Sequence, residues 1–99
     1  MALVLTFSLV GLTADKYDRI VDWLKNDDAG SPQGRLYHVC FGDPNNLTIS
    51  DIWESRASFE RFGEVMSPML KDLGIEPVEP EEFGVHNILE GTQIKTATR

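Results

Sequence analysis

The sequence predicts an α+β protein in which four strands and two helices follow one another in the order β-α-β-β-α-β. Three observations predict this order. Short runs rich in β-branched, aromatic and aliphatic residues are typical of strands, and two longer runs repeat apolar residues at the 3.6-residue period of a helix. A Gly-Asp-Pro-Asn-Asn segment between two strand-like runs is typical of a hairpin turn. The length of 99 residues suits one domain spanning residues 1–99.

The first strand and the first helix are predicted near the N-terminus. Residues 2–10, ALVLTFSLV, are largely apolar on both faces, which favours a strand that is covered on both sides. Gly11 ends this strand, and Thr13 is a suitable N-cap for the helix that follows. The helix has an apolar stripe at helical spacing, made of Tyr17, Ile20, Val21 and Leu24. Residues 26–34 are rich in Asp, Gly, Ser and Pro and are predicted to be a loop.

The second and third strands are predicted to form a hairpin. Residues 35–42, RLYHVCFG, and residues 47–54, LTISDIWE, have strand composition. The turn between them, residues 42–46, contains a proline that fixes φ, while its glycine and asparagines tolerate positive φ. So short a connection joins antiparallel neighbours.

A second helix and a last strand complete the pattern. Ser55 is the expected N-cap, Pro68 should kink the helix or split it, and Gly74 should end it. The apolar stripe of this helix consists of Phe59, Phe62, Met66, Met69, Leu70 and Leu73. An acidic connection, residues 75–82, then leads to a fourth strand at residues 83–89 and to a polar tail at residues 91–99.

This order is the ferredoxin-like split βαβ motif. Right-handed crossovers give an antiparallel sheet in the order 4-1-3-2 with both helices on one face. The strands nevertheless carry apolar residues on both faces, with Val4, Val10, Leu36 and Ile52 expected opposite to Leu3, Phe7 and Val39. The uncovered face therefore needs a partner, and a second copy of the chain supplies one through a two-fold interface. We expect a homodimer through the open sheet face.

Charge and cysteine content exclude several partners. The net charge of −7 disfavours nucleic acid and anionic membrane surfaces, which both require clustered Lys and Arg. The apolar N-terminal run is shorter than the roughly 20 residues of a membrane span and has no basic segment before it. Cys40 is the only cysteine, so the chain forms no internal disulfide, which fits a reducing compartment. We expect a cytoplasmic protein that contacts neither nucleic acid nor membrane.

The strand-to-helix junction Trp53-Glu54-Ser55 and the helix run ASFERF, residues 57–62, resemble the dimeric α+β barrel superfamily, near the antibiotic-biosynthesis-monooxygenase-like (ABM-like) domains. The resemblance covers residues 2–90. It implies a dimeric barrel, and the superfamily includes cofactor-free oxygenases of polyphenols, haem-degrading enzymes and isomerases. Because one fold carries several activities, the resemblance predicts the fold more firmly than the activity.

The haem-degrading branch is the one that the residues disfavour. Its members resemble this chain at the Trp-x-Ser junction, but they carry an Asn on the first strand, a Trp at the position of Phe62 and a His further along the second helix. The first strand here has no Asn, and residues 63–73 contain no His. We therefore expect no haem and no other cofactor.

Three polar side chains within apolar strands are the candidate catalytic groups: His38, His86 and Asp51. A histidine near its ordinary pKa can act as a general base, and a nearby carboxylate can orient it. If the hairpin closes symmetrically about its turn, Asp51 lies near Tyr37 or His38. The alternative is structural: His38 as a satisfied core or interface residue, His86 with Asn87 as hydrogen-bonding groups of an edge strand, and Asp51 as a buried acceptor.

Aromatic residues are the candidate walls of a ligand pocket, namely Tyr37, Trp53, Phe59 and Phe62, with Asn87 as a polar group. Trp53 is interpreted as a core or pocket-wall aromatic in preference to a reactive group. No metal site is expected, because the two histidines and Cys40 lie on strands at opposite edges of the sheet and zinc needs three or four convergent ligands. A Cys40–His38 nucleophile pair is also disfavoured, since side chains at i and i+2 of a strand stand about 6–7 Å apart.

Two functions remain open from the sequence. The first is a cofactor-independent monooxygenase or isomerase of an aromatic or polyketide-like small molecule, an activity that the resemblance implies. The second is a non-catalytic dimeric module that binds a small apolar or aromatic ligand or serves assembly. A pocket of roughly 300 Å³ or more with a histidine in its wall would favour the first.

Overall fold

The computed structural model describes residues 2–26, 32–89 and 91. The elements follow the expected order: β1 (Leu3–Ser8), α1 (Ala14–Asn26), β2 (Arg35–Asp43), β3 (Asn46–Trp53), α2 (Arg56–Asp72) and β4 (Glu81–Gly84). Most of the predicted loop at residues 26–34 and nearly all of the polar tail lie outside the described residues. No helix within the described ranges is long and apolar enough to cross a membrane.

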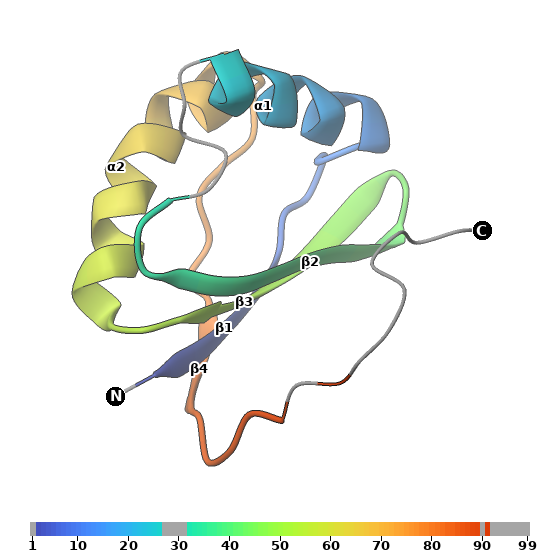
Figure 1. Ribbon diagram of the computed structural model, residues 1–99. Helices are drawn as coiled ribbons and strands as arrows, with labels where there is room; N and C mark the ends of the chain where they lie inside the picture. Colours follow the sequence, from blue (N-terminus) through green and yellow to red (C-terminus); the bar gives the residue numbers. More distant parts are fainter. Residues whose placement is uncertain (1, 27–31, 90, 92–99) are drawn as a thin grey trace.

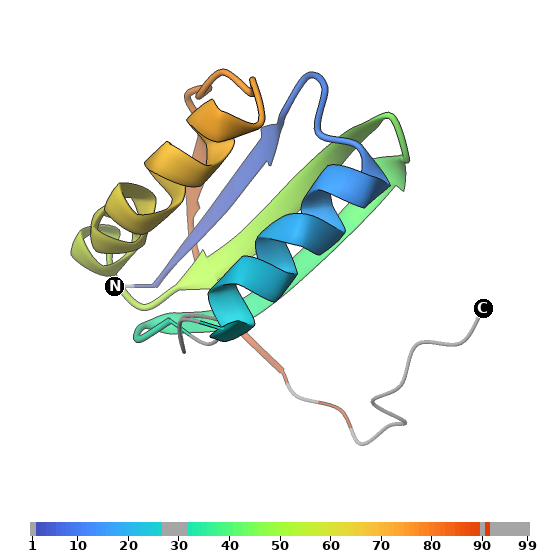
Figure 2. The same cartoon turned by 90° about the horizontal axis from the view of Figure 1, so that it is seen from above.

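The four strands form one antiparallel sheet in the order β2-β3-β1-β4. This is the predicted order 4-1-3-2 read from the other edge, so the ferredoxin-like α+β prediction is confirmed. Both helices lie on the same side of the sheet (Figure 1), and the view from above shows them running side by side across it (Figure 2). The helices and the sheet thus form two layers.

The helix ends are where the capping residues place them. The backbone N–H of Lys16 donates to the Thr13 hydroxyl, and the backbone N–H of Ser58 donates to the Ser55 hydroxyl. At the end of α2, Gly74 has a φ of 73°, and the next residue, Ile75, donates its N–H to the carbonyl of Leu70 at 2.9 Å. These bonds form a Schellman motif, which needs a residue that tolerates positive φ.

Two expected boundaries are corrected. Pro68 does not split α2, which is continuous from Arg56–Asp72. The last strand is Glu81–Gly84 and not residues 83–89, because β4 pairs only with Leu3–Thr6 of β1. Beyond Gly84, the Val85 N–H still donates to the Ala2 carbonyl, but β1 has no further residues to extend the ladder.

The core lies between the helices and the sheet. Trp53, Leu5 and Leu12 are fully buried. A larger cluster of buried residues comes from α1, β3 and the segments that follow β1 and α2, and it consists of Leu9, Leu12, Ile20, Leu24, Leu47, Ile49 and Ile75. Strand β3 alternates strictly between buried and partly exposed positions, which is the pattern of a strand with one face on the core.

The opposite face of the sheet is uncovered and partly apolar. The strand register aligns Tyr37, Ile52, Val4 and Phe83 in one row across all four strands. Tyr37 is 61% exposed and Phe83 is 56% exposed. Val39 lies on the same face as Tyr37, because it alternates with His38 along β2. The expectation that Val39 faces opposite to Val4 and Ile52 is therefore wrong.

Candidate acid–base site between helices and sheet

A cavity of about 340 Å³ lies between the two helices and the sheet. Its wall is mostly apolar, with contributions from both helices, from β1, β2 and β3, and from the segments that follow β1 and α2. A small group of polar side chains opens into it: Tyr17, Arg35, His38, Asp51 and Ser67. An apolar pocket with a few converging polar groups is the usual form of a small-molecule site.

His38 and Asp51 are directly opposite each other on β2 and β3. The Nδ1 atom of His38 lies 2.6 Å from Oδ1 of Asp51, and both side chains face the helices. Asp51 is 4% exposed, whereas His38 is only partly buried. Of the two neighbours that the hairpin allowed for Asp51, the structure selects His38.

The second carboxylate oxygen of Asp51 also has a donor. Trp53 Nε1 donates to Oδ2 of Asp51 at 3.3 Å. With one oxygen facing His38 and the other facing Trp53, the carboxylate is fixed on both sides. In the described part of the chain, no buried side-chain nitrogen or oxygen lacks a hydrogen-bond partner. Both oxygens of the buried Asp51 carboxyl group are therefore paired, which offsets the cost of burying it.

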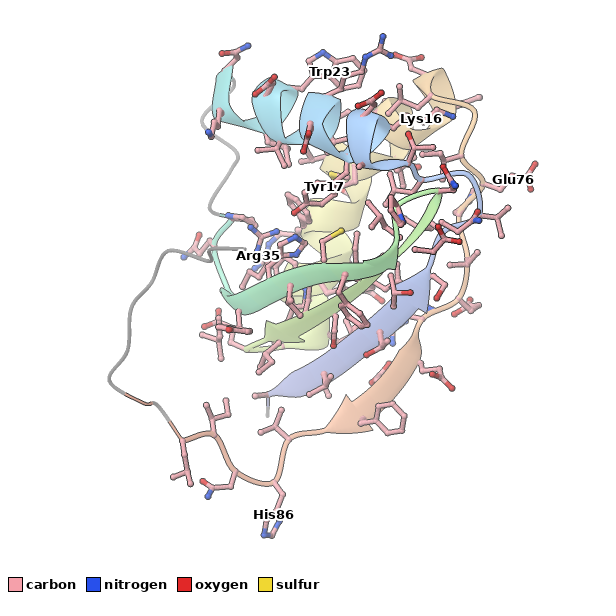
Figure 3. The ribbon with its side chains drawn as sticks, turned by 90° about the vertical axis from the view of Figure 1, so that its right-hand side faces the viewer. Lys16, Tyr17, Trp23, Arg35, Glu76 and His86 are labelled. Atoms are coloured by element: carbon pink, nitrogen blue, oxygen red, sulfur yellow. The ribbon has the colours of Figure 1, made fainter. Side chains whose placement is uncertain are left out.

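Tyr17 extends this arrangement from α1. Its hydroxyl lies 2.6 Å from Nε2 of His38, and the two rings are nearly parallel, at 2°. Figure 3 shows Tyr17 pointing from α1 toward the sheet. Burial raises the pKa of the Tyr17 phenol, so Tyr17 keeps its proton at neutral pH. As a phenol it donates to Nε2, which leaves the proton of a neutral His38 on Nδ1, facing Asp51.

The result is one continuous chain of hydrogen bonds: Tyr17 hydroxyl, His38 imidazole, Asp51 carboxylate and Trp53 indole. Tyr17 was not among the sequence candidates. It lies on the apolar stripe of the first helix, where a tyrosine is interpreted as a core residue. The signal that could have identified Tyr17 is its hydroxyl, a polar group on an otherwise apolar helix stripe that faces the sheet carrying His38.

Arg35 reaches the pocket because of a β-bulge. The register pairs Arg35 with Trp53 and Tyr37 with Ile52, so Leu36 is an extra residue in β2. In a regular strand, residues 35 and 38 would face opposite sides. The bulge turns Arg35 to the side of His38, and both line the cavity. Sequence reasoning missed Arg35, because strand alternation alone places it on the other face.

The aromatic walls are Phe59 and Phe62 of α2, which both line the cavity as expected. Trp53 stands against them: its ring centroid is 5.9 Å from that of Phe59 at 69°, and 5.6 Å from that of Phe62 at 40°. Trp53 itself is fully buried and is not among the lining residues. Its indole therefore supports the pocket wall and Asp51.

Three expected site residues lie elsewhere. Tyr37 is on the open face of the sheet, because it alternates with His38 along β2. His86 and Asn87 are exposed and follow the end of β4, and His86 projects away from the layers in Figure 3. The structure thus gathers His38, Asp51, Phe59 and Phe62 at the pocket and separates them from the other three.

Cys40 is not among the residues that line the cavity. The side chain packs against the core cluster, and burial raises the pKa of its thiol, which disfavours the reactive thiolate. Among the residues that the structure describes, no three His, Cys, Asp or Glu side chains are grouped to hold a metal ion. The chemistry that this pocket supports is proton transfer by the Tyr17–His38–Asp51 chain.

The fold is similar to that of two solved structures. A protein of Deinococcus radiodurans described as a "putative antibiotic biosynthesis monooxygenase" has a TM-score of 0.57 and 13% identity, over 94% of this chain and 100% of the other. SnoaB, a cofactor-independent oxygenase of Streptomyces nogalater, also has a TM-score of 0.57, with 16% identity over 91% of this chain and 96% of its own. No family model and no curated protein matches the sequence. At these identities the expected resemblance to ABM-like domains is confirmed as a likeness of fold.

Proposed function

We propose that this protein is a cofactor-independent enzyme that binds a small aromatic or polyketide-like molecule between helices and sheet and removes a proton from it. The observation that carries the proposal is the hydrogen-bonded chain from Asp51 through His38 to Tyr17, which ends in an otherwise apolar cavity. A base positioned by a carboxylate in a space of this kind is the arrangement that general base catalysis requires.

The proton moves along the existing hydrogen bonds. The substrate gives a proton from an acidic O–H or C–H group to the Tyr17 oxygen while the Tyr17 proton passes to Nε2 of His38. Because burial raises the Tyr17 pKa, a free tyrosinate is disfavoured and the two transfers occur together. The imidazolium that results lies against the Asp51 carboxylate, which stabilises its charge. The bonding electron pair stays on the substrate as an anion.

This anion has two outcomes. Return of the proton to another carbon completes an isomerisation. Reaction with dioxygen completes a monooxygenation. One oxygen atom is added to a ring carbon of a phenol, which becomes a quinone, and the other oxygen atom leaves as water. The fold is compatible with the second outcome, since SnoaB is named a cofactor-independent oxygenase. The assignment here is supported by the pocket residues, because the likeness extends to the fold alone.

The functional unit that we propose is a homodimer formed by the open sheet face. The apolar row across the sheet supports it, as do two hydroxyl pairs beside that row: Thr6 with Ser50, and Ser8 with Thr48, each at 3.0 Å. Because these hydroxyls bond to each other across strands, covering the face would leave none of them without a partner. A second copy is a self-complementary cover.

One observation favours a non-catalytic alternative. Every buried polar side-chain atom in the described residues is already paired, so a structural role in holding α1 on the sheet is by itself sufficient to explain these hydrogen bonds. In that case the protein would be a dimeric module that binds a small ligand or serves assembly.

The experiment that separates these functions compares the two histidines of the chain. A panel of naphthols, anthrones and aromatic 1,3-diketones is screened for binding by thermal shift. Dioxygen uptake, product mass and the chromatographic retention of the product, which reveals an isomer of unchanged mass, are then measured for the wild type, His38→Gln and His86→Gln. We expect His38→Gln to bind the hit but to turn it over at least about 10²-fold more slowly. His86→Gln, altered outside the pocket, should match the wild type.

Two results would contradict the enzyme. Binding without turnover by the wild type would support the ligand-binding module instead. Equal turnover by His38→Gln and the wild type would remove the histidine from the chemistry. The dimer is judged separately, by sedimentation of the same samples at micromolar concentration.

A further inference from the structure

Arg35 is the one lysine or arginine among the described residues that line the cavity. The chain carries a net charge of −7, so the arginine in the cavity wall is a positive charge in a molecule that is negative as a whole. Its position depends on the extra residue Leu36, and bulges of this kind often re-aim a side chain beside a functional site. The bulge therefore calls for an explanation beyond packing.

The guanidinium of Arg35 is held among the groups of the proposed acid–base site. It lies over the ring of Phe62, with 5.5 Å between the guanidinium carbon and the ring centroid. Its positive charge acts on Tyr17, where it lowers the phenol pKa against the larger, opposing effect of burial. Arg35 and Tyr17 thus face the same part of the cavity from the sheet and from α1 (Figure 3).

We infer that Arg35 is the anion-binding residue of this pocket and that the ligand is an aromatic molecule bearing an acidic oxygen, such as a carboxylate, a phenolate or an enolate. The inference rests on the proposed ligand pocket and names the class of molecule that fills it. A guanidinium has five N–H donors in a planar fork, so it binds a planar oxyanion well and can serve more than one partner.

The ring and the oxyanion of such a ligand contact different parts of the site. The aromatic body meets the apolar wall that Phe59 and Phe62 provide, and the oxygen meets Arg35 near Tyr17. In the proposed reaction, negative charge grows on the substrate as its proton leaves toward His38. Arg35 supplies a fixed positive charge for that anion, in a partly enclosed space where electrostatic interactions are stronger than in water.

The test uses two probes of nearly the same shape, 2-naphthoate and 2-naphthamide, and dissociation constants from calorimetry at pH 7.5. We expect the wild type to bind the acid at least about tenfold more tightly than the amide, the ratio that one charge-assisted hydrogen bond supplies. Arg35→Met, which keeps a long apolar stem, should lose this ratio while its affinity for the amide stays the same. Arg35→Lys should keep part of the ratio, because it retains the charge without the fork.

Arg56 offers a matched control. Its guanidinium carbon lies 5.8 Å from the centroid of Phe59, much as Arg35 lies over Phe62, but Arg56 is outside the cavity and pairs with Glu60 and Glu82. Arg56→Met should therefore leave the acid-to-amide ratio unchanged. A melting temperature for each variant separates a lost anion site from a lost packing contact.

The outcomes are distinct. Equal binding of both probes by the wild type overturns the anion site and leaves the pocket proposal standing. An unchanged ratio in Arg35→Met overturns it as well and assigns Arg35 to packing against Phe62. Binding of neither probe by the wild type, up to millimolar concentration, overturns the anion site together with the ligand pocket.

Discussion

Nδ1 of His38 lies 2.6 Å from Oδ1 of Asp51, at directly opposed positions of β2 and β3, and the other oxygen of Asp51 accepts from Trp53. This relationship fixes which nitrogen of His38 carries the proton. An ionised carboxylate accepts from two donors, so a neutral His38 is protonated on Nδ1 and leaves Nε2 as the acceptor for Tyr17.

Asp51→Asn should reverse this tautomer. An asparagine offers one acceptor and one donor, so it cannot accept from both His38 and Trp53. The arrangement that leaves nothing unpaired turns its oxygen to Trp53 and its NH₂ group to His38, which moves the imidazole proton to Nε2; the opposite arrangement leaves a buried N–H unpaired, at about 1–3 kcal/mol. Nitrogen-15 shifts of the imidazole measure the tautomer directly.

The control for this change is Asp72→Asn, at the exposed end of α2. It should leave the His38 shifts unchanged. If Asp51→Asn also kept the Nδ1–H form, the assignment of the hydrogen bonds around Asp51 would be wrong. Turnover of any substrate should fall with the tautomer, because the nitrogen that faces Tyr17 would no longer accept a proton.

Tyr17→Phe tests whether the proton passes through the phenol. Removal of the hydroxyl breaks the path between the cavity and Nε2 of His38. We expect turnover to fall at least about 10²-fold with little change in ligand affinity, because the ring remains in the pocket wall. Tyr37→Phe, on the open face, is the matched control and should behave as the wild type. An increase in turnover for Tyr17→Phe would mean that the hydroxyl only blocks the base.

That Asp51 lies opposite Tyr37 or His38 could be predicted, and the reason is local. A short turn around Pro44 and Asn45 sets the register of the hairpin, and strand alternation then places every residue on one face or the other. The element order and the sheet order follow from periodicity and from handed crossovers in the same way. Rules that act over short stretches of sequence were therefore sufficient to predict the fold.

The contributions of Tyr17 and Arg35 could not be predicted by those rules. Tyr17 meets His38 only through the way α1 packs on the sheet, a contact between elements that periodicity does not describe. Arg35 faces the cavity because of the bulge at Leu36, which reverses the alternation that the sequence suggests. The role expected of His86 depended on a longer last strand, and the end of β4 is set by the short length of β1 available for pairing.

Stability at alkaline pH should report the buried phenol. Burial raises the pKa of Tyr17 above its ordinary value of 10.0, so above that pH the folded protein holds a proton that the unfolded chain releases. The contribution of Tyr17 is fully present below pH 10 and is lost as the pH rises toward the folded pKa. The difference in free energy of unfolding between the wild type and Tyr17→Phe should thus change above pH 10, to the disadvantage of the wild type.

The measurement is urea unfolding of both proteins at intervals from pH 8 to pH 11. Burial also raises the thiol pKa of Cys40, so Cys40 lowers the free energy of unfolding in the same direction as the pH rises. Cys40 is present in both proteins, so its effect largely cancels in the difference. A difference between the wild type and Tyr17→Phe that stayed constant across this range would show that the phenol is not shielded from water.

The proposed dimer makes a prediction about two exposed apolar residues. Phe41 is 47% exposed at the end of β2 on the open face, and Val65 is 43% exposed on α2. Phe41→Lys would place a charge inside the two-fold interface, opposite its own copy or the apolar row, and should shift the protein to monomers. Val65→Lys changes a side chain of similar exposure on the helical side and should leave the dimer intact. Sedimentation velocity at micromolar concentration measures both. A monomeric wild type would contradict the dimer, and equal dimerisation of the two variants would show that the dimer does not form through the open sheet face.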